Sequence, residues 1–343
     1  MHKDVVNMCK TITILLLYSG MKKRLLSGIQ PSGNLHLGNY FGAIKQFVDL
    51  QDKYESYIFI ADFHALTTIK DKKVLAENVY NVALGYLSCG LDPSKICLFK
   101  QSDIPEVAEL TWYFNCITRM PYLERATAYK DAHFKAKEVN VGLFDYPMLM
   151  AADILIQDAN VVPVGADQKQ HIEYARDTAQ KFNSTFGETF VLPEALIMKD
   201  VSVVPGIDGR KMSKSYKNTI PLFASDQEIK KCVMKIVTDS KTPEEKKDPD
   251  ACNIFSLHKL FLNKDDLDKL RQKYINGGMS YKESKDLLVN EIIKFITPLR
   301  ERRKYFEQNP NKIKEILDNG AITVRERIKN KMEKVRVNIG IKS

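Results

Sequence analysis

The sequence predicts an α/β protein with a doubly wound, Rossmann-like parallel sheet and a C-terminal all-helical domain. Three observations predict this class. Apolar strand-like segments alternate with amphipathic helical segments from residue 24 to about residue 182, strand signals fade after about residue 216, and 343 residues are enough for two domains. Because such sheets bind ligands at the carboxyl ends of their strands, the residues that follow each strand are candidates for a functional site.

Four strands are expected in chain order, each a short apolar run. They are LLSGI (25–29), YIFIA (57–61), ICLFK (96–100) and NVVPV (160–164). The helices expected between and after them span residues 39–51, 74–90, 105–130 with an interruption at Pro121, 143–157 and 167–182. Further helical patterns at 227–237, 253–262, 265–275 and 281–299 predict the second domain.

The chain is expected to divide into three parts. Residues 1–20 are an extension outside the fold, or the start of translation was assigned too early. Residues 21–216 form a Rossmann-like domain, and residues 217–343 form a helical domain with a basic tail. The apolar run TITILLLYS is too short to span a bilayer, and no small-x-small cleavage site follows it, so neither a membrane anchor nor a secretion signal is expected. The six cysteines have no C-x-x-C spacing, which argues against a zinc site and a disulfide scaffold and favours a reducing compartment such as the cytoplasm.

Positive charge is concentrated at the C-terminal end. The net charge is +9, and residues 300–343 hold 13 Lys or Arg against 6 Asp or Glu. A basic end fits a polyanion partner such as nucleic acid, and the alternative is a solvated helical face. On the first interpretation, Arg325, Arg327 and Lys329 contribute to binding the polyanion.

Residues 28–42, GIQPSGNLHLGNYFG, follow the first expected strand. The glycines allow close backbone approach to a ligand, and the loop runs into a helix N-terminus near Asn39, which suits a phosphate. His36 is then placed to donate to phosphate oxygens, although a glycine-bearing turn is the plainer interpretation. His64 follows the second strand, where it could serve the same crevice or be an ordinary core or surface histidine.

The helix GLFDYPMLMAADILIQ places Tyr146, Met150 and Asp153 on one face, because they are related as i, i+4 and i+7. A carboxylate in so apolar a segment needs a hydrogen-bond donor, and one alternative is an internal ion pair with a Lys or Arg. The other is a pocket with an aromatic wall, an apolar floor and one acceptor. Such a pocket suits a flat aromatic ligand with a single N–H donor, such as indole.

Two further segments carry chemistry. In VVPVGADQKQH (161–171), Asp167 could accept from ribose hydroxyls or cap the next helix, and Gln168 could do either. The basic stretch DGRKMSKSYKNT (208–219) could be a solvated connector or a loop that handles anions. Because it has few apolar anchors, we expect it to move, with Lys211 and Lys214 as mobile cations. Arg210 and Lys217 are assigned to neither interpretation.

Together these segments resemble the class I aminoacyl-tRNA synthetases and, within them, the tryptophanyl-tRNA synthetase family of the bacterial type. HLGN (36–39) is similar to that family's HIGH signature, and KMSKS (211–215) matches its second signature. SGIQPSG, LMAADIL, VPVGADQKQH and DGRKMSKSYKN are similar to family segments in the same order, from about Met21 to the C-terminus. The resemblance implies that L-tryptophan is activated with ATP and Mg²⁺ to an adenylate and then transferred to tRNA(Trp). It also implies an anticodon-binding helical domain and a cytoplasmic homodimer.

The resemblance implies roles for individual residues. His36, Lys211 and Lys214 are the implied catalytic residues. The implied ATP-binding residues are Gln30, Pro31, Ser32, Gly38, Asn39, Gly165, Ala166, Asp167, Val203, Lys211, Met212, Ser213, Lys214 and Ser215. The implied tryptophan-binding residues are His64, Tyr146, Met150, Asp153, Val162, Val164 and Gln168. The chain departs from the family at Ala166, where many relatives carry an acidic residue, and at Leu26, where some carry an aromatic one.

Three alternative functions are less consistent with the sequence. A tyrosyl-tRNA synthetase has the same fold and chemistry, but a phenol both donates and accepts, so the apolar Met150 beside Asp153 disfavours it. A non-catalytic paralogue that binds tRNA or a tryptophan-like ligand is disfavoured because HLGN, KMSKS and Asp153 are all present. A generic adenylyltransferase leaves the helical domain and the basic tail unexplained.

Overall fold

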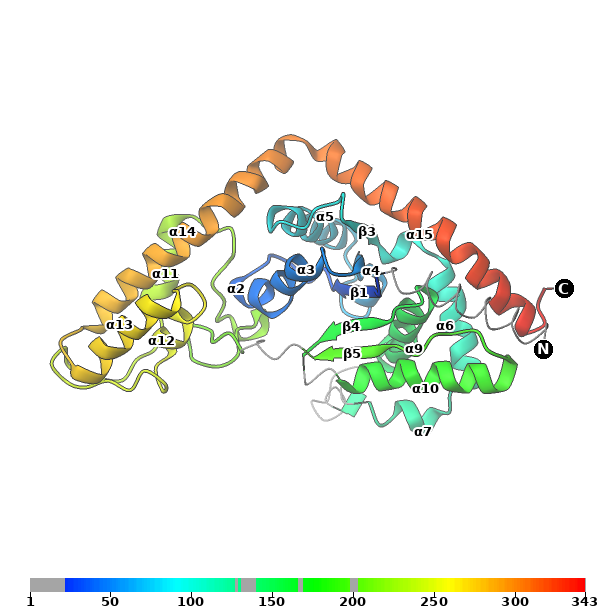
Figure 1. Ribbon diagram of the computed structural model, residues 1–343, viewed down its shortest axis with the longest axis horizontal. Helices are drawn as coiled ribbons and strands as arrows, with labels where there is room; N and C mark the ends of the chain where they lie inside the picture. Colours follow the sequence, from blue (N-terminus) through cyan, green and yellow to red (C-terminus); the bar gives the residue numbers. More distant parts are fainter. Residues whose placement is uncertain (1–21, 127–128, 131–139, 166–168, 198–202, 343) are drawn as a thin grey trace, which may run out of the picture.

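The computed structural model describes residues 22–126, 129–130, 140–165, 169–197 and 203–342. A five-stranded parallel sheet lies at its centre (Figure 1). Its strands are β1 (Arg24–Ile29), β2 (Glu55–Ile60), β3 (Ile96–Lys100), β4 (Val161–Val164) and β5 (Glu194–Ile197), in the order β3-β2-β1-β4-β5. This confirms the doubly wound class and the four expected strands. The sequence reasoning did not identify β5, a four-residue edge strand with no buried position.

Helices cover both faces of the sheet, because alternate strand residues point to opposite sides. Leu25 and Ile58 pack with α3 (Lys45–Leu50) and α5 (Lys72–Ser88). Leu26 and Phe59 pack with α6 (Glu106–Ile117), α9 (Val141–Ile156) and α10 (Lys169–Phe186). The expected helices are therefore present and enclose the sheet on two sides.

Local chemistry explains where the helices begin and end. The Asp71 side chain accepts hydrogen bonds from the backbone N–H groups of Lys73 and Val74, which starts α5. Gly90, the expected cap, follows its end with φ of +104°, a conformation that favours glycine. Asn140 caps α9 in the same way by accepting from Leu143 N–H.

Two expectations about helices were wrong in detail. The helix expected over 39–51 is α2 (Leu37–Asn39), a π-helical turn η1 (Tyr40–Ile44) and α3. Pro121 does not interrupt a helix, because α6 has already ended at Ile117 and Pro121 lies in the first turn of α7 (Met120–Leu123). Proline is favoured there, since the first N–H groups of a helix have no partner within the helix.

The region beyond residue 216 is helical, as expected. It contains α11 (Asp226–Met234), α12 (Asn253–His258), α13 (Lys264–Asn276), α14 (Tyr281–Gln308) and α15 (Pro310–Asn338). The first four follow the predicted patterns, although α14 continues beyond residue 299. Within the described ranges, none of the helices combines the length and the apolar character needed to cross a membrane.

The last helix leaves the helical region and returns to the sheet. Figure 1 shows α14 rising from α11–α13 and α15 descending along the opposite side of the molecule. Gly320 of α15 lies against the backbone of Leu98 in β3, and Val324, Ile328 and Met332 join the core that contains α9. Residues 310–338, expected as part of the helical domain, therefore cover the edge strand of the other domain.

Candidate active site

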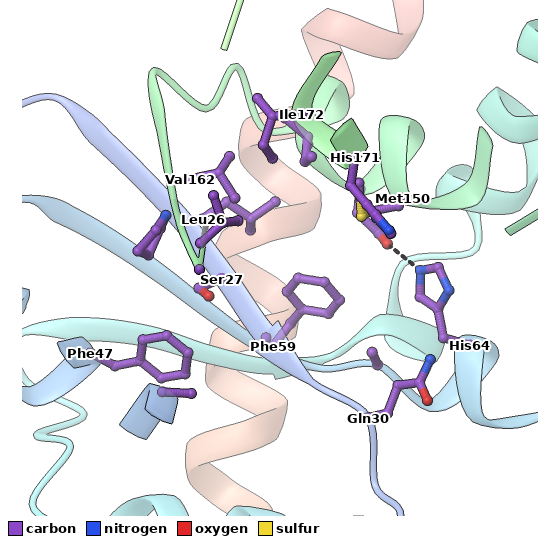
Figure 2. Close-up of a pocket in the computed structure, with 18 of the residues that line it drawn as sticks. Leu26, Ser27, Gln30, Phe47, Phe59, His64, Met150, Val162, His171 and Ile172 are labelled. Atoms are coloured by element: carbon purple, nitrogen blue, oxygen red, sulfur yellow. Dashed lines mark hydrogen bonds and ion pairs between the residues drawn. The ribbon is translucent and has the colours of Figure 1, made fainter. Parts of the chain in front are cut away.

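A cavity of about 380 Å³ opens at the carboxyl ends of β1 and β4. The strand order reverses between these two strands, which is where doubly wound sheets bind their ligands. Figure 2 shows side chains from both strands and from α9 pointing into it. Its lining includes His64, Tyr146, Met150, Asp153, Val162 and Val164. Six of the seven residues predicted for the tryptophan site thus lie together, and Gln168 falls outside the described residues.

Asp153 is buried, with 5% of its surface exposed, and accepts hydrogen bonds from two side chains. His64 Nε2 lies 3.1 Å from its Oδ2, the contact drawn as a dashed line in Figure 2. Gln101 Nε2 lies 2.9 Å from both carboxylate oxygens. Burial raises the pKa of Asp153, and the hydrogen bonds from His64 and Gln101 oppose that rise. The donor that the sequence required is therefore a histidine and a glutamine, rather than a Lys or Arg.

Gln101 is a site residue that the sequence reasoning missed. It lies in the 3₁₀ turn η2 (Gln101–Asp103), immediately after β3, and is 1% exposed. Its Oε1 accepts from the backbone N–H groups of Phe63 (3.0 Å) and His64 (3.3 Å), which begin the short helix α4 (Asp62–Ala65). Its place at a strand's carboxyl end was the one available signal, since a lone glutamine forms no motif.

His171 was also missed. It lines the cavity from α10, and its Nε2 lies 3.1 Å from the Tyr146 hydroxyl. The ring centroids of Tyr146 and His171 are 5.6 Å apart, and the His64 ring centroid lies 6.4 Å from that of Tyr146. The predicted aromatic wall is therefore fixed in place by two imidazoles.

The HLGN segment forms a tight N-terminal turn. Asn39 Oδ1 accepts from the backbone N–H of His36 at 3.1 Å. A Cβ at Gly38 would lie 2.9 Å from His36 Nδ1, so a larger residue there would displace the His36 imidazole. His36 is buried, and burial together with nearby Lys214 lowers the pKa of His36 from 6.5 to about 4. Its imidazole is therefore neutral at physiological pH, with one ring N–H available as a donor.

The KMSKS loop packs directly on this turn. Gly38 N–H donates to Met212 Sδ at 3.3 Å, and Met212 is 5% exposed. Two backbone hydrogen bonds also join residues 35–37, beside the HLGN turn, to residues 220–222, which follow the KMSKS loop. Leu222 N–H donates to Leu35 O and Leu37 N–H donates to Ile220 O, each at 3.0 Å. The two signatures are far apart in sequence but adjacent in the fold.

The loop is better anchored than its composition suggests. Besides Met212, Asn218 is 1% exposed, and its side chain bonds Ser213 N (2.8 Å), Asp208 Oδ1 (2.7 Å) and Lys211 O (3.1 Å). Met212 is the buried apolar side chain of the segment 208–219, in agreement with the expectation of few apolar anchors. The loop positions its polar groups in this conformation through one thioether and one amide.

The cations of the loop differ in their surroundings. Lys214 Nζ donates to Ser32 O at 3.2 Å, and partial burial lowers the pKa of Lys214. Arg210 pairs with Asp208 at 2.7 Å and lies over the Tyr216 ring at 4.4 Å, so it braces the loop. Lys217 has φ of +53° and ends the short 3₁₀ turn η4 (Lys214–Tyr216). The contacts of Arg210 give it a structural role in the loop.

Only some of the other residues predicted to bind ATP lie at the cavity. Gln30 and Gly165 line the cavity. Ser213 and Ser215 bond each other through their hydroxyls at 2.8 Å. Val203 is 64% exposed and does not line the cavity. Ala166 and Asp167 lie outside the described residues.

Two of the three basic-tail residues have structural partners. Arg325 Nε donates to Asp103 O at 2.6 Å. Arg327 is half-buried, donates to Gln157 O and lies over the Tyr57 ring at 4.5 Å. Both therefore join α15 to the Rossmann-like domain, and these contacts favour a structural role over the binding of a polyanion. Lys329 is exposed.

Comparison with known proteins agrees with this geometry. The profile of a family described as tRNA synthetases class I (W and Y) matches residues 19–297. A tryptophan–tRNA ligase of Fusobacterium nucleatum is 50% identical and covers 93% of this chain and 98% of its own length. One from Rhodopirellula baltica is 48% identical, covering 93% of this chain and its own full length, 100%.

A solved structure extends the similarity to the fold. The crystal structure of tryptophanyl-tRNA synthetase from Campylobacter jejuni, complexed with ADP and tryptophan, has a TM-score of 0.86. It is 47% identical and covers 92% of this chain and 99% of that one. With the family profile spanning most of the chain and relatives at about half identity over nearly its whole length, the chain belongs to the class I tRNA synthetases of the tryptophan and tyrosine family.

Proposed function

We propose that this protein is a tryptophan–tRNA ligase. It activates L-tryptophan with ATP to tryptophanyl-adenylate and pyrophosphate, then transfers the tryptophanyl group to the 3′-terminal adenosine of tRNA(Trp). The observation that carries the proposal is Asp153, a buried acceptor in an apolar cavity at the sheet's switch point. The names of the relatives, and the tryptophan and ADP of the Campylobacter jejuni complex, support it.

The cavity suits indole better than phenol. Asp153 accepts the indole N–H, Tyr146 forms the aromatic wall, and Met150, Val162 and Val164 supply apolar surface. A phenol would need a donor and an acceptor near its oxygen, and Met150 provides neither. A site built to satisfy one N–H rejects a ligand that lacks it, because the buried acceptor is then left unpaired.

Activation needs positioning and charge stabilisation rather than a protein nucleophile. A carboxylate oxygen of tryptophan attacks the α-phosphorus of ATP, and pyrophosphate leaves with the bonding electrons. Lys211 and Lys214 stabilise the charge on the departing phosphates, and neutral His36 donates a hydrogen bond. Mg²⁺ is proposed to bind together with ATP, because it prefers oxygen ligands and is held largely by substrate phosphates in such sites.

The helical region α11–α14 is proposed to bind the tRNA anticodon, as the family resemblance implies. A homodimer in the cytoplasm is also proposed on that basis. A second cavity of about 550 Å³ between α4, α6 and α9 supports the dimer, because it is bordered by Leu66 and Val141, exposed by 45% and 79%. Trp112, the single tryptophan of the chain, lies one turn beyond Ala108 of that cavity and is 66% exposed. A blue shift of its fluorescence with rising protein concentration, matched by sedimentation, tests the dimer.

Amino-acid-dependent exchange of labelled pyrophosphate into ATP tests the main proposal. Tryptophan should drive the exchange and tyrosine should not. Exchange driven by tyrosine alone would make the protein a tyrosine enzyme. Binding of tryptophan without exchange would indicate the non-catalytic paralogue instead.

A further inference from the structure

Gln101 occupies a position that needs an acceptor on one side and a donor on the other, which the two ends of a primary amide supply. On one side are two backbone N–H groups, those of Phe63 and His64, which can only donate. On the other is the Asp153 carboxylate, which can only accept when ionised. The amide oxygen must therefore face the backbone and the amide nitrogen must face Asp153, so the orientation of the Gln101 side chain is determined by its partners.

This arrangement connects three parts of the fold at one buried point. Gln101 follows β3, its amide oxygen holds the start of α4, and its nitrogen spans both oxygens of Asp153 on α9. His64, from α4 itself, makes the second contact to the same carboxylate. Gln101 does not line the cavity, so it acts on a ligand only through Asp153 and His64.

We propose that Gln101 is a positioning residue for amino-acid selection: it fixes the Asp153 carboxylate in the one orientation that accepts an indole N–H. With both oxygens bonded to Gln101 and one also to His64, the carboxylate cannot rotate without breaking a buried hydrogen bond. Asp153 is thereby preorganised before the ligand enters. This inference rests on the proposed function, since it concerns the selection of tryptophan.

The test uses a pair of ligands that differ at one atom. Tryptophan is compared with 3-(benzothiophen-3-yl)alanine, in which sulfur replaces the indole N–H, in pyrophosphate exchange with the full-length protein. The ratio of the two kcat/KM values measures how strongly the site prefers a ligand with the N–H group that Asp153 accepts. In Gln101→Met, which keeps the length of the side chain but removes its donors, we expect that ratio to fall about tenfold. The KM for ATP should stay unchanged.

Gln51→Met is the matched control. Gln51 is also buried, at 7% exposed, and its amide also bridges backbone groups, accepting from Asp92 N–H at 2.9 Å and donating to Gly90 O at 3.4 Å. It has no contact with Asp153 and does not line the cavity. Its variant should keep the wild-type ratio, even if its thermal stability drops.

A second variant covers the case in which Gln101→Met fails to fold. Gln101→Asn keeps an amide oxygen for the two backbone N–H groups, but its side chain is one methylene shorter and cannot also reach both oxygens of Asp153, so it should also show the reduced ratio. A wild-type ratio in either folded variant, or equal losses for tryptophan and ATP, would overturn the positioning role. Absence of tryptophan-dependent exchange in the wild-type protein would instead overturn the proposed function.

Discussion

Gly320 of α15 lies so close to Leu98 of β3 that a Cβ at position 320 would be 1.9 Å from the Leu98 carbonyl oxygen. No flexible side chain can yield here, because the obstacle is the backbone of the edge strand. Gly320→Ala should therefore force α15 away from the sheet and reduce the free energy of unfolding by about 1–3 kcal/mol. Urea unfolding measures this change.

Gly142→Ala is the control for that prediction. Gly142 also lies in a helix, α9, but its nearest neighbours would be 3.4 and 3.6 Å from a new Cβ, which is ordinary contact. The free energy of unfolding should stay the same or rise by up to about 1 kcal/mol, because alanine favours the helix. Equal destabilisation by both substitutions would show that the α15–β3 contact is not special.

Arg327 and Lys329 should behave differently although both are basic and close in sequence. Arg327→Met breaks the bond to Gln157 O and the stacking on Tyr57, so it should cost about 1–3 kcal/mol of stability. Lys329→Met should change stability by less than about 0.5 kcal/mol. Urea unfolding measures both, and tRNA binding at two salt concentrations gives the second readout. A variant at Arg327 that folds normally but loses tRNA affinity would restore the polyanion interpretation of that residue.

Asp153→Ala should impair tryptophan activation far more than ATP binding. The substitution removes the one acceptor for the indole N–H and leaves the donors of His64 and Gln101 unpaired. Loss of a hydrogen bond to a charged group, about 1.5–3 kcal/mol, corresponds to roughly 10- to 100-fold in kcat/KM for tryptophan. Pyrophosphate exchange with each substrate varied in turn measures the two effects, and comparable losses for ATP and tryptophan would contradict the assigned role.

His258 should make the helical region sensitive to acid. It is fully buried, its Nε2 lies 3.1 Å from Ser284 O, and burial lowers the pKa of His258 from 6.5 to about 4. Between those pH values the unfolded chain binds a proton that the folded chain does not, so stability falls as the pH drops from 6.5 to 4. The loss approaches about 3 kcal/mol at pH 4.

Replacing the imidazole isolates this contribution. His258→Gln keeps a donor toward Ser284 but does not titrate, so its stability should fall less steeply over the same pH range, as urea unfolding at pH 7 and pH 4.5 would measure. Some acid sensitivity should remain, because the pKa of His36 is lowered to about 4 as well. An unchanged slope in the variant would show that His258 is not a source of the effect.

The sequence was sufficient for the features that are local or periodic. Apolar segments predicted the helices and the four strands that contain buried residues. The i, i+4, i+7 spacing placed Tyr146, Met150 and Asp153 on one wall of the cavity. The short edge strand β5 carries too few buried residues for such a pattern. Helical periodicity shows which residues share one face of a helix, and the cavity wall formed by α9 is such a face.

Features that depend on distant contacts could not be predicted in this way. Gln101 owes its role to Asp153, 52 positions later, and α15 owes its position to β3. Arg325 and Arg327 looked like solvated or nucleic-acid-binding charges because their partners, Asp103 O and Gln157 O, are backbone atoms that no composition reveals. A side chain's sequence neighbours do not identify the carbonyl that it will bind.

The position of α15 also determines when the protein can finish folding during its own synthesis. The helix is synthesised after all five strands of the sheet, and until it docks, β3 presents the open edge of a parallel sheet. Every earlier element is therefore made within a nascent chain whose catalytic sheet is still uncovered on that side. Emergence of α15, rather than emergence of the Rossmann-like segment, is the event that closes this edge to pairing with other strands.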